Sequence, residues 1–172
     1  MQIRRIARAT AADIEGLADV LVDCVEGGAS VSFMLPMTRD KALAFWRKVA
    51  QSAVQGERIL LVAQEGERIV GTVQVVHDLP ENQPHRADIS KMLVHRSMRK
   101  RGAGEALMRA AEEAAAQAGK SLLVLDTASA DAERLYERCG WQRVGTIPNY
   151  ALLPQGGLCD TVYFYKDLSA AK

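Results

Sequence analysis

Residues 99–104, Arg-Lys-Arg-Gly-Ala-Gly, combine three basic side chains with two glycines just before a helical pattern begins at Glu105. Gly102 and Gly104 lack a Cβ, so a ligand can approach the backbone closely. The first turn of the following helix offers unpaired N–H groups and the positive end of its dipole. Because all of these features favour negative charge, the segment predicts an anion site suited to a pyrophosphate.

Other phosphate-binding loops fit this segment less well. A P-loop requires lysine and then serine or threonine after its second glycine, whereas Gly104 is followed by Glu105 and Ala106. The dinucleotide fingerprint requires a third glycine where this chain has Leu107. The pattern that remains is Arg-x-x-Gly-x-Gly, beginning at Arg99. A basic strand-to-helix turn with a glycine hinge stays open as the alternative interpretation.

Two aspartates at strand ends are candidates for proton transfer. Asp88 begins a strand-like segment that runs to Val94, and Asp126 ends an apolar run that starts at Ser121. An alkylammonium, with a pKa of about 10, must lose a proton before its nitrogen can attack an acyl group. A carboxylate at the reacting end can accept that proton, directly or through water. The alternative is that both are solvated residues at strand ends.

Strand-like and helical segments alternate along the chain and must position these residues. The expected order is strand 2–6, helix 10–24, helix 39–54, strands 58–64, 68–77 and 88–94, helix 105–118, strand 121–126, helix 130–139, and strands 141–146 and 161–165. We expect the apolar strand 121–126 to be buried on both faces, and the segment 148–157, rich in proline and glycine, to be a loop. This order predicts an α/β sandwich around a mixed sheet.

Helix ends are marked by capping residues. Thr10, with Asp13 three residues later, resembles a capping box. Gly27 and Gly28 should stop the first helix, and Thr38 can cap the second.

Length and charge limit the classes of function. The 172 residues match the usual size of one domain, so we expect residues 1–172 to form a single one. The net charge is +1, which gives no overall field favouring nucleic acid or an anionic membrane. The basic cluster 96–101 could contact nucleic acid, but no aromatic residues alternate with its basic ones, so we expect no nucleic-acid partner.

Cysteine usage and hydropathy indicate a cytoplasmic protein. Cys24, Cys139 and Cys159 are odd in number and far apart, and none forms a Cys-x-x-Cys pair. The amino-terminal residues show no signal-peptide pattern, and no apolar run reaches the roughly 18 residues that would span a bilayer. We therefore expect reduced thiols and no membrane partner. The three histidines lack metal-ligand spacing, so no metal site is expected.

The loop that begins at Arg99 resembles the coenzyme A loop of the GNAT (GCN5-related N-acetyltransferase) family. A second motif, Ala132-Glu-Arg-Leu-Tyr-Glu-Arg-Cys-Gly-Trp141, is similar to the Ala-x-x-x-Tyr-x-x-x-Gly-Phe helix of that family. Ser129 stands where the family often has asparagine, and Trp141 replaces the phenylalanine. The resemblance covers nearly the whole chain. It implies a GNAT-like mixed central sheet flanked by helices, in the order β-α-α-β-β-β-α-β-α-β-β, with acetyl-CoA as cosubstrate.

The tabtoxin-resistance acetyltransferases within that family resemble the chain more closely, over residues 27–34, 125–127 and 148–150. Those enzymes acetylate a β-lactam amino-acid toxin, and two carboxylates are implicated in their active site. By motif these fall on Asp88, where the family has glutamate, and on Asp126. The resemblance therefore implies transfer of an acetyl group to a small amine, with antibiotic or toxin resistance as the role.

Further site residues follow from the family resemblance and from the order of the elements. Tyr136, which could be an ordinary core residue, becomes the acid that returns a proton to the coenzyme A thiolate. The expected cofactor-binding residues are Met92, Leu93, Val94, Arg99, Lys100, Arg101, Gly102, Ala103, Gly104, Glu105 and Ser129. The loop between the first two helices should line the acceptor pocket, through Glu26, Ser30, Ser32 and Phe33.

The acetyl acceptor remains open at this point. We expect a primary amine on a small molecule, acetylated directly and without an acyl-enzyme on Cys139. The alternatives are a protein or peptide N-acetyltransferase and a catalytically silent coenzyme A-binding module. Whether the chain works as a monomer or as a homodimer is also open.

Overall fold

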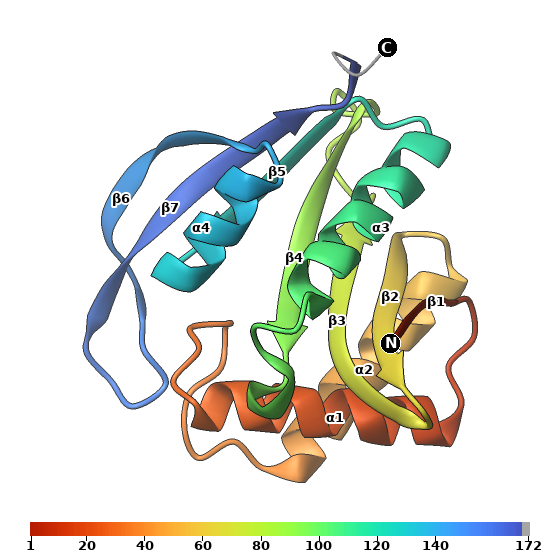
Figure 1. The fold of residues 1–172 in the computed structure, drawn as a ribbon, viewed down its shortest axis with the longest axis vertical. Helices are drawn as coiled ribbons and strands as arrows, with labels where there is room; N and C mark the ends of the chain where they lie inside the picture. The colour runs from red at the N-terminus through yellow and green to blue at the C-terminus, as the bar shows by residue number, and fades with distance from the viewer. Residues whose placement is uncertain (170–172) are drawn as a thin grey trace.

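The computed structural model describes residues 1–169, which form one seven-stranded sheet flanked by helices (Figure 1). The strands lie in the order β1-β2-β3-β4-β5-β7-β6. The elements are β1 (Gln2–Ile6), α1 (Ala11–Glu26), α2 (Arg39–Val54), β2 (Arg58–Glu65), β3 (Arg68–Val76), β4 (Arg86–Val94), the short 3₁₀ helix η1 (Arg96–Met98), α3 (Ala103–Gln117), β5 (Leu122–Thr127), α4 (Ala130–Arg138), β6 (Gln142–Leu152) and β7 (Leu158–Asp167). The predicted α/β class and order of elements are confirmed.

The junction between β4 and β5 shapes the site. These two strands are parallel and pair over only three residues each, from Arg86 opposite Leu122 to Asp88 opposite Val124. The other neighbouring strands are antiparallel. Past Asp88 the two strands separate, and β5 stays paired with β7 instead (Figure 1). The sheet therefore opens between the carboxyl ends of β4 and β5.

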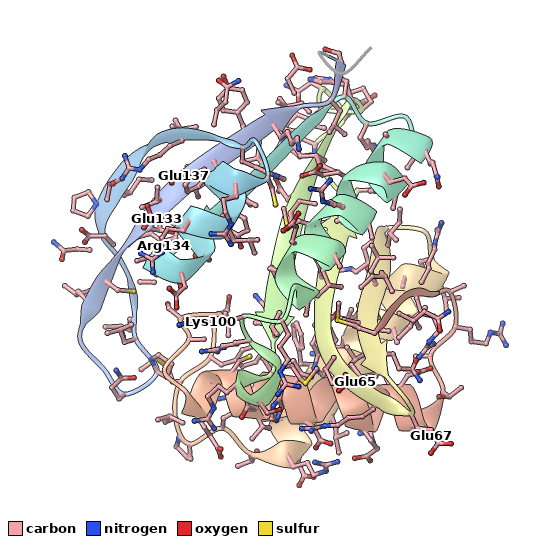
Figure 2. The ribbon with its side chains drawn as sticks, viewed as in Figure 1. Glu65, Glu67, Lys100, Glu133, Arg134 and Glu137 are labelled. Atoms are coloured by element: carbon pink, nitrogen blue, oxygen red, sulfur yellow. The ribbon has the colours of Figure 1, made fainter. Side chains whose placement is uncertain are left out.

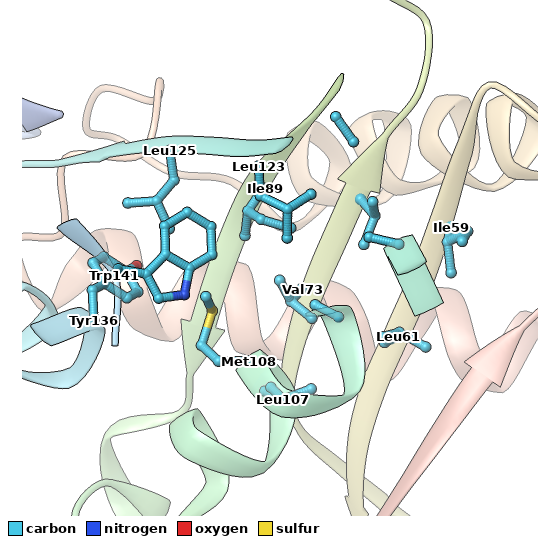
Figure 3. Close-up of a cluster of buried hydrophobic side chains, with 14 of the residues drawn as sticks. Ile59, Leu61, Val73, Ile89, Leu107, Met108, Leu123, Leu125, Tyr136 and Trp141 are labelled. Atoms are coloured by element: carbon cyan, nitrogen blue, oxygen red, sulfur yellow. The ribbon is translucent and has the colours of Figure 1, made fainter. Parts of the chain in front are cut away.

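Two buried cores lie on opposite faces of the sheet. On one face, α3 and the residues around α4 pack on β2 to β5 and β7, through side chains that include Leu107, Met108 and Trp141 (Figure 3). On the other face, α1 and α2 pack on β1 to β4, with Trp46 fully buried. A membrane-spanning helix would have to be longer and more apolar than any helix within residues 1–169.

Capping fixes the start of α1 as the sequence predicts. The Thr10 hydroxyl accepts a hydrogen bond from the Asp13 amide, and the Asp13 carboxylate accepts one from the Thr10 amide. Burial alone would raise the pKa of Asp13, but hydrogen bonds from Arg4 and Thr10 outweigh it and leave the pKa below its usual value. The predicted cap of α2 by Thr38 is also confirmed.

A bulge interrupts β4 at the edge of the opening. Thr72 of β3 lies opposite Leu93, but Gln74 lies opposite Ser90, so β4 carries one residue more than β3 over this stretch. Lys91, within the bulge, has a φ of +50°, which L-residues other than glycine rarely adopt. The bulge re-aims the Lys91 side chain and ends simple alternation along the strand.

Two predictions about strands are wrong. Residues 148–152 belong to β6 and not to a loop. Because β6 is an edge strand, the missing N–H of Pro148 interrupts no central hydrogen-bond ladder, and the register shift between Ile147 and Ala151 accommodates the proline. β5 is not buried on both faces, because Asp126 is exposed and the core under α1 and α2 contains no described residue of β5. That uncovered face of β5 leads into the site.

Candidate active site

A cleft of about 1010 Å³ occupies the opening between β4 and β5. Its walls come from five parts of the chain: residues 27–32 after α1, residues 89–94 of β4, the loop before α3, residues 125–129 with one side of α4, and the β6–β7 hairpin. These segments lie far apart in the sequence. The cleft therefore exists only because the two parallel strands diverge.

The amino end of α3 forms one end of the cleft. Gly102 is the N-cap residue of α3, with a left-handed φ of +84°, and no side chain caps the helix there. The first amides of α3 are therefore left for a ligand, and the helix dipole favours an anionic one. Arg99 and Lys100 line the same end. These features fit the pyrophosphate of coenzyme A.

α4 carries cations that the sequence analysis did not identify. Arg134 and Arg138 line the cleft together with Ser129, the N-cap residue of α4. Figure 2 shows Arg134 on α4 and Lys100 on the loop that precedes α3, on the two sides of the opening. Both arginines lie within the recognised helix motif, but only the fold shows that they face the basic loop.

Three of the expected cofactor-binding residues are placed differently from the rest of the loop. Arg101 is outside the cleft lining, with Nη1 3.7 Å from the Met98 sulfur. The Ala103 side chain is buried, and Glu105 lines the cleft while pairing with Arg109. Backbone amides at these positions can still donate hydrogen bonds to an anion, because anion binding at a helix amino end uses the main chain and not the side chains.

Gly104 has a packing role beside its place in the cleft. A Cβ built on Gly104 would lie 2.9 Å from Cδ2 of Leu135, on α4. A side chain at this position would have to push the end of Leu135 aside, so glycine favours the close approach of α3 and α4.

The edge of β4 forms a second wall. Met92, Leu93 and Val94 line the cleft, and past Asp88 this edge has no strand partner within residues 1–169. The Val94 carbonyl accepts hydrogen bonds from the Arg99 side chain, at 3.3 Å, and from the Cys24 thiol, at 3.5 Å. The remaining free backbone groups on this edge suit the amides of an extended pantetheine.

Tyr136 lies at the inner end of the cleft. Its ring lies against Trp141 (Figure 3), at 6.2 Å between centroids, and also packs against Phe164, at 5.7 Å. Burial, with the negative charge of Asp126 second, raises the pKa of Tyr136 well above its usual value. The hydroxyl therefore stays protonated at neutral pH and is available as a proton donor.

The structure separates the two candidate carboxylates. Asp126 lines the cleft, and its Oδ2 accepts a hydrogen bond of 2.7 Å from the Thr161 hydroxyl. Asp88 lies on the same sheet face but is paired with Arg86 and is absent from the cleft lining. Thr161 and its role could not be assigned from the sequence.

The loop after α1 contributes fewer residues than expected. Ser30 and Ser32 line the cleft, but Glu26 is exposed outside it. Phe33 also lies outside the lining and packs edge-on against Phe45, at 5.1 Å between centroids. Two of the four expected residues therefore line the cleft, and Phe33 packs the loop against α2.

Lys91 is the site residue that the sequence analysis missed most clearly. It lines the cleft, and its Nζ donates a hydrogen bond of 3.1 Å to the Ser32 hydroxyl. Strand alternation alone would not place it there, because the bulge at φ +50° redirects it.

Comparison with known proteins agrees with this architecture. The family model described as "Acetyltransferase (GNAT) family" matches residues 30–141. Ribosomal-protein-alanine N-acetyltransferase from Brucella melitensis is 22% identical, with a TM-score of 0.80, over 98% of this chain and 100% of that chain. YncA from Salmonella typhimurium, solved with its cofactor acetyl-CoA, is 20% identical, with a TM-score of 0.80, over 98% and 94%.

A phosphinothricin acetyltransferase from Sinorhizobium meliloti, in complex with acetyl-CoA, is 16% identical, with a TM-score of 0.80, over 97% of this chain and 88% of that chain. At these identities the likeness to solved structures shows the fold, and the family match covers well over half of the chain. The chain belongs to the GNAT acetyltransferase family, with acetyl-CoA as its cosubstrate.

Proposed function

We propose that the protein transfers the acetyl group of acetyl-CoA directly to the primary amine of a small molecule. The observation that carries the proposal is that Asp126 and Tyr136 line the same cleft as the uncapped end of α3. A proton acceptor, a proton donor and an anion site are then within reach of one extended cosubstrate.

Each residue has a defined part in the reaction. Acetyl-CoA supplies an acetyl group activated as a thioester. Asp126 accepts a proton from the acceptor ammonium, so that the nitrogen can form its bond to the acetyl carbon as the carbon–sulfur bond breaks. Tyr136 donates its hydroxyl proton to the departing sulfur. The second nitrogen proton then restores the Tyr136 hydroxyl, and Asp126 releases its proton to solvent, so that the products are the acetamide, the coenzyme A thiol and one proton. Asp88 lies on the same sheet face as Asp126 and is also a candidate base. It ranks second because its carboxylate is already paired with Arg86.

The enclosure of the cleft supports a small acceptor. The loop after α1 contacts the β6–β7 hairpin, where the Leu35 amide donates to the Pro154 carbonyl at 2.9 Å. The Ser30 hydroxyl donates to the Leu152 carbonyl at 3.3 Å, close to the Cys159 thiol. These contacts tie two walls of the cleft together, and a folded protein segment would have to break them to enter.

Thiol release from acetyl-CoA in the presence of different acceptors tests the proposal. The panel should contain amino acids and other small amines, phosphinothricin and aminoglycosides, as the names of two structural neighbours suggest, and short peptides. We expect turnover with one or more small amines, including amino-acid-like toxins. Turnover with peptides alone would overturn the small-molecule assignment. Binding of acetyl-CoA without acceptor-dependent thiol release would identify a silent module instead.

A further inference from the structure

Lys91 and Ser32 hold a strained contact inside the cleft. Both residues have positive φ values, +50° for Lys91 and +76° for Ser32, although neither is glycine. Their side chains meet at 3.1 Å, between Lys91 Nζ and Ser32 Oγ. Left-handed backbone of this kind is unfavourable for residues other than glycine and gathers at ligand sites. Two such residues in contact indicate a local arrangement that serves a ligand.

The charge of Lys91 is not neutralised by the protein. Within residues 1–169 no carboxylate lies within ion-pair distance of its Nζ, whose polar contact is the neutral Ser32 hydroxyl. Burial lowers the pKa of Lys91, the nearby Asp126 charge partly offsets this, and Arg58 adds a smaller lowering. A partly buried cation without an anion partner is costly, and an anionic group on a ligand would remove that cost.

Lys91 and Asp126 present opposite charges from the two strands that diverge around the cleft. Their charges influence one another, but they form no ion pair. A molecule that carries both an ammonium and a carboxylate has the complementary pair of charges. If the ammonium faces Asp126, the carboxylate faces Lys91.

We propose that Lys91 binds the carboxylate of the acceptor, and that the acceptor is therefore an amino acid or a close analogue of one. This inference rests on the proposed function and narrows its substrate class. Ser32 is a positioning residue, since its hydroxyl accepts from Lys91 Nζ and holds the ammonium in place. The Phe45 ring, 6.0 Å from Nζ, helps to keep the side chain in the cleft.

The test compares three matched acceptors: an L-amino acid, its carboxamide, and the amine that lacks the carboxyl group. Each of the common amino acids is tried with the parent enzyme, and the best one defines the set. The parent should prefer the acid to both neutral forms. Lys91→Met should raise the KM for the acid by about tenfold to hundredfold, as expected for a lost charged hydrogen bond, and leave the KM for the amine unchanged.

Two further variants separate the charge from the fold. Lys91→Arg should keep the preference for the acid, because the cation is retained. Lys41→Met is the matched control: Lys41 also lies over an aromatic ring, that of Phe33 at 5.9 Å, but is outside the cleft lining. It should leave every KM unchanged.

The outcomes distinguish this inference from the function on which it rests. Turnover of carboxamides or simple amines by the parent enzyme as efficiently as of any acid overturns the carboxylate site but leaves the transferase intact. This comparison needs no variant, so it holds even if Lys91→Met fails to fold. Thiol release with none of the acceptors, peptides and aminoglycosides included, overturns the proposed function itself.

Discussion

Replacing Tyr136 with phenylalanine removes one hydroxyl from the cleft and little else. The Tyr136 side chain is only 4% exposed, and its ring is held between Trp141 and Phe164. Phenylalanine keeps these aromatic contacts and almost the same volume, so the hydrophobic packing should survive. Any change in rate should therefore report the lost proton donor, and acetyl-CoA should bind nearly as before.

The size of the effect follows from the loss of general acid catalysis. Because burial raises its pKa, the hydroxyl is protonated at every pH below about 10, and the whole enzyme population carries the donor. General acid catalysis contributes roughly 100- to 10,000-fold. At about 1.36 kcal/mol for each factor of ten, Tyr136→Phe should raise the barrier by roughly 2.7 to 5.4 kcal/mol and lower kcat accordingly.

Steady-state thiol release measures this directly. The loss in kcat should shrink when the acetyl donor is a thioester of a more acidic thiol, because that thiolate needs less protonation. Tyr165→Phe is the matched control, since the Tyr165 hydroxyl bonds Gln142 and lies outside the cleft lining. An unchanged kcat for Tyr136→Phe, or an equal loss in both variants, would refute the assignment of Tyr136 as the acid.

Four other substitutions test the rest of the site and the fold. Asp126→Asn should lower kcat by roughly 100- to 10,000-fold, and its residual rate should rise with pH as solution removes the amine proton. Asp88→Asn should lower kcat by less. If pH–rate profiles show the larger loss in Asp88→Asn, Asp88 is the base and the two roles are exchanged. Gly104→Val should destabilise the fold by about 1 to 3 kcal/mol, because the added side chain displaces the end of Leu135. Adding Leu135→Ala should recover part of the Tm, but the affinity for acetyl-CoA measured by calorimetry should stay below that of the parent protein. The pKa of Asp13 is lower in the folded protein than its ordinary value of 3.8, so its carboxylate stabilises the fold above pH 3.8. This contribution is lost as the pH falls through the folded pKa. The free energy of unfolding of Asp13→Asn in urea should therefore be below that of the parent protein at pH 7 and approach it in acid.

Local sequence signals account for most of the fold. Capping at Thr10 and Thr38 is set by residues within one turn, so these helix starts could be predicted. Errors arose where a distant segment decides the outcome. Pro148 predicts a loop unless β6 is known to be an edge strand. The apolar sequence of β5 predicts burial on both faces unless its divergence from β4 is known.

The candidate site also combines residues that local sequence identifies with residues that only the fold brings together. The basic glycine loop and the motif around Tyr136 are contiguous in sequence, so their chemistry can be read before the fold is known. Lys91 could not be identified in this way, because its direction depends on a bulge that is fixed by the pairing of β3 with β4. Acetyl transfer needs the contiguous motifs, whereas the choice of acceptor depends on side chains that the diverging strands bring together. A family resemblance therefore predicts the reaction of this chain better than its substrate. The opposite charges of Lys91 and Asp126 are the features from which the substrate should be inferred.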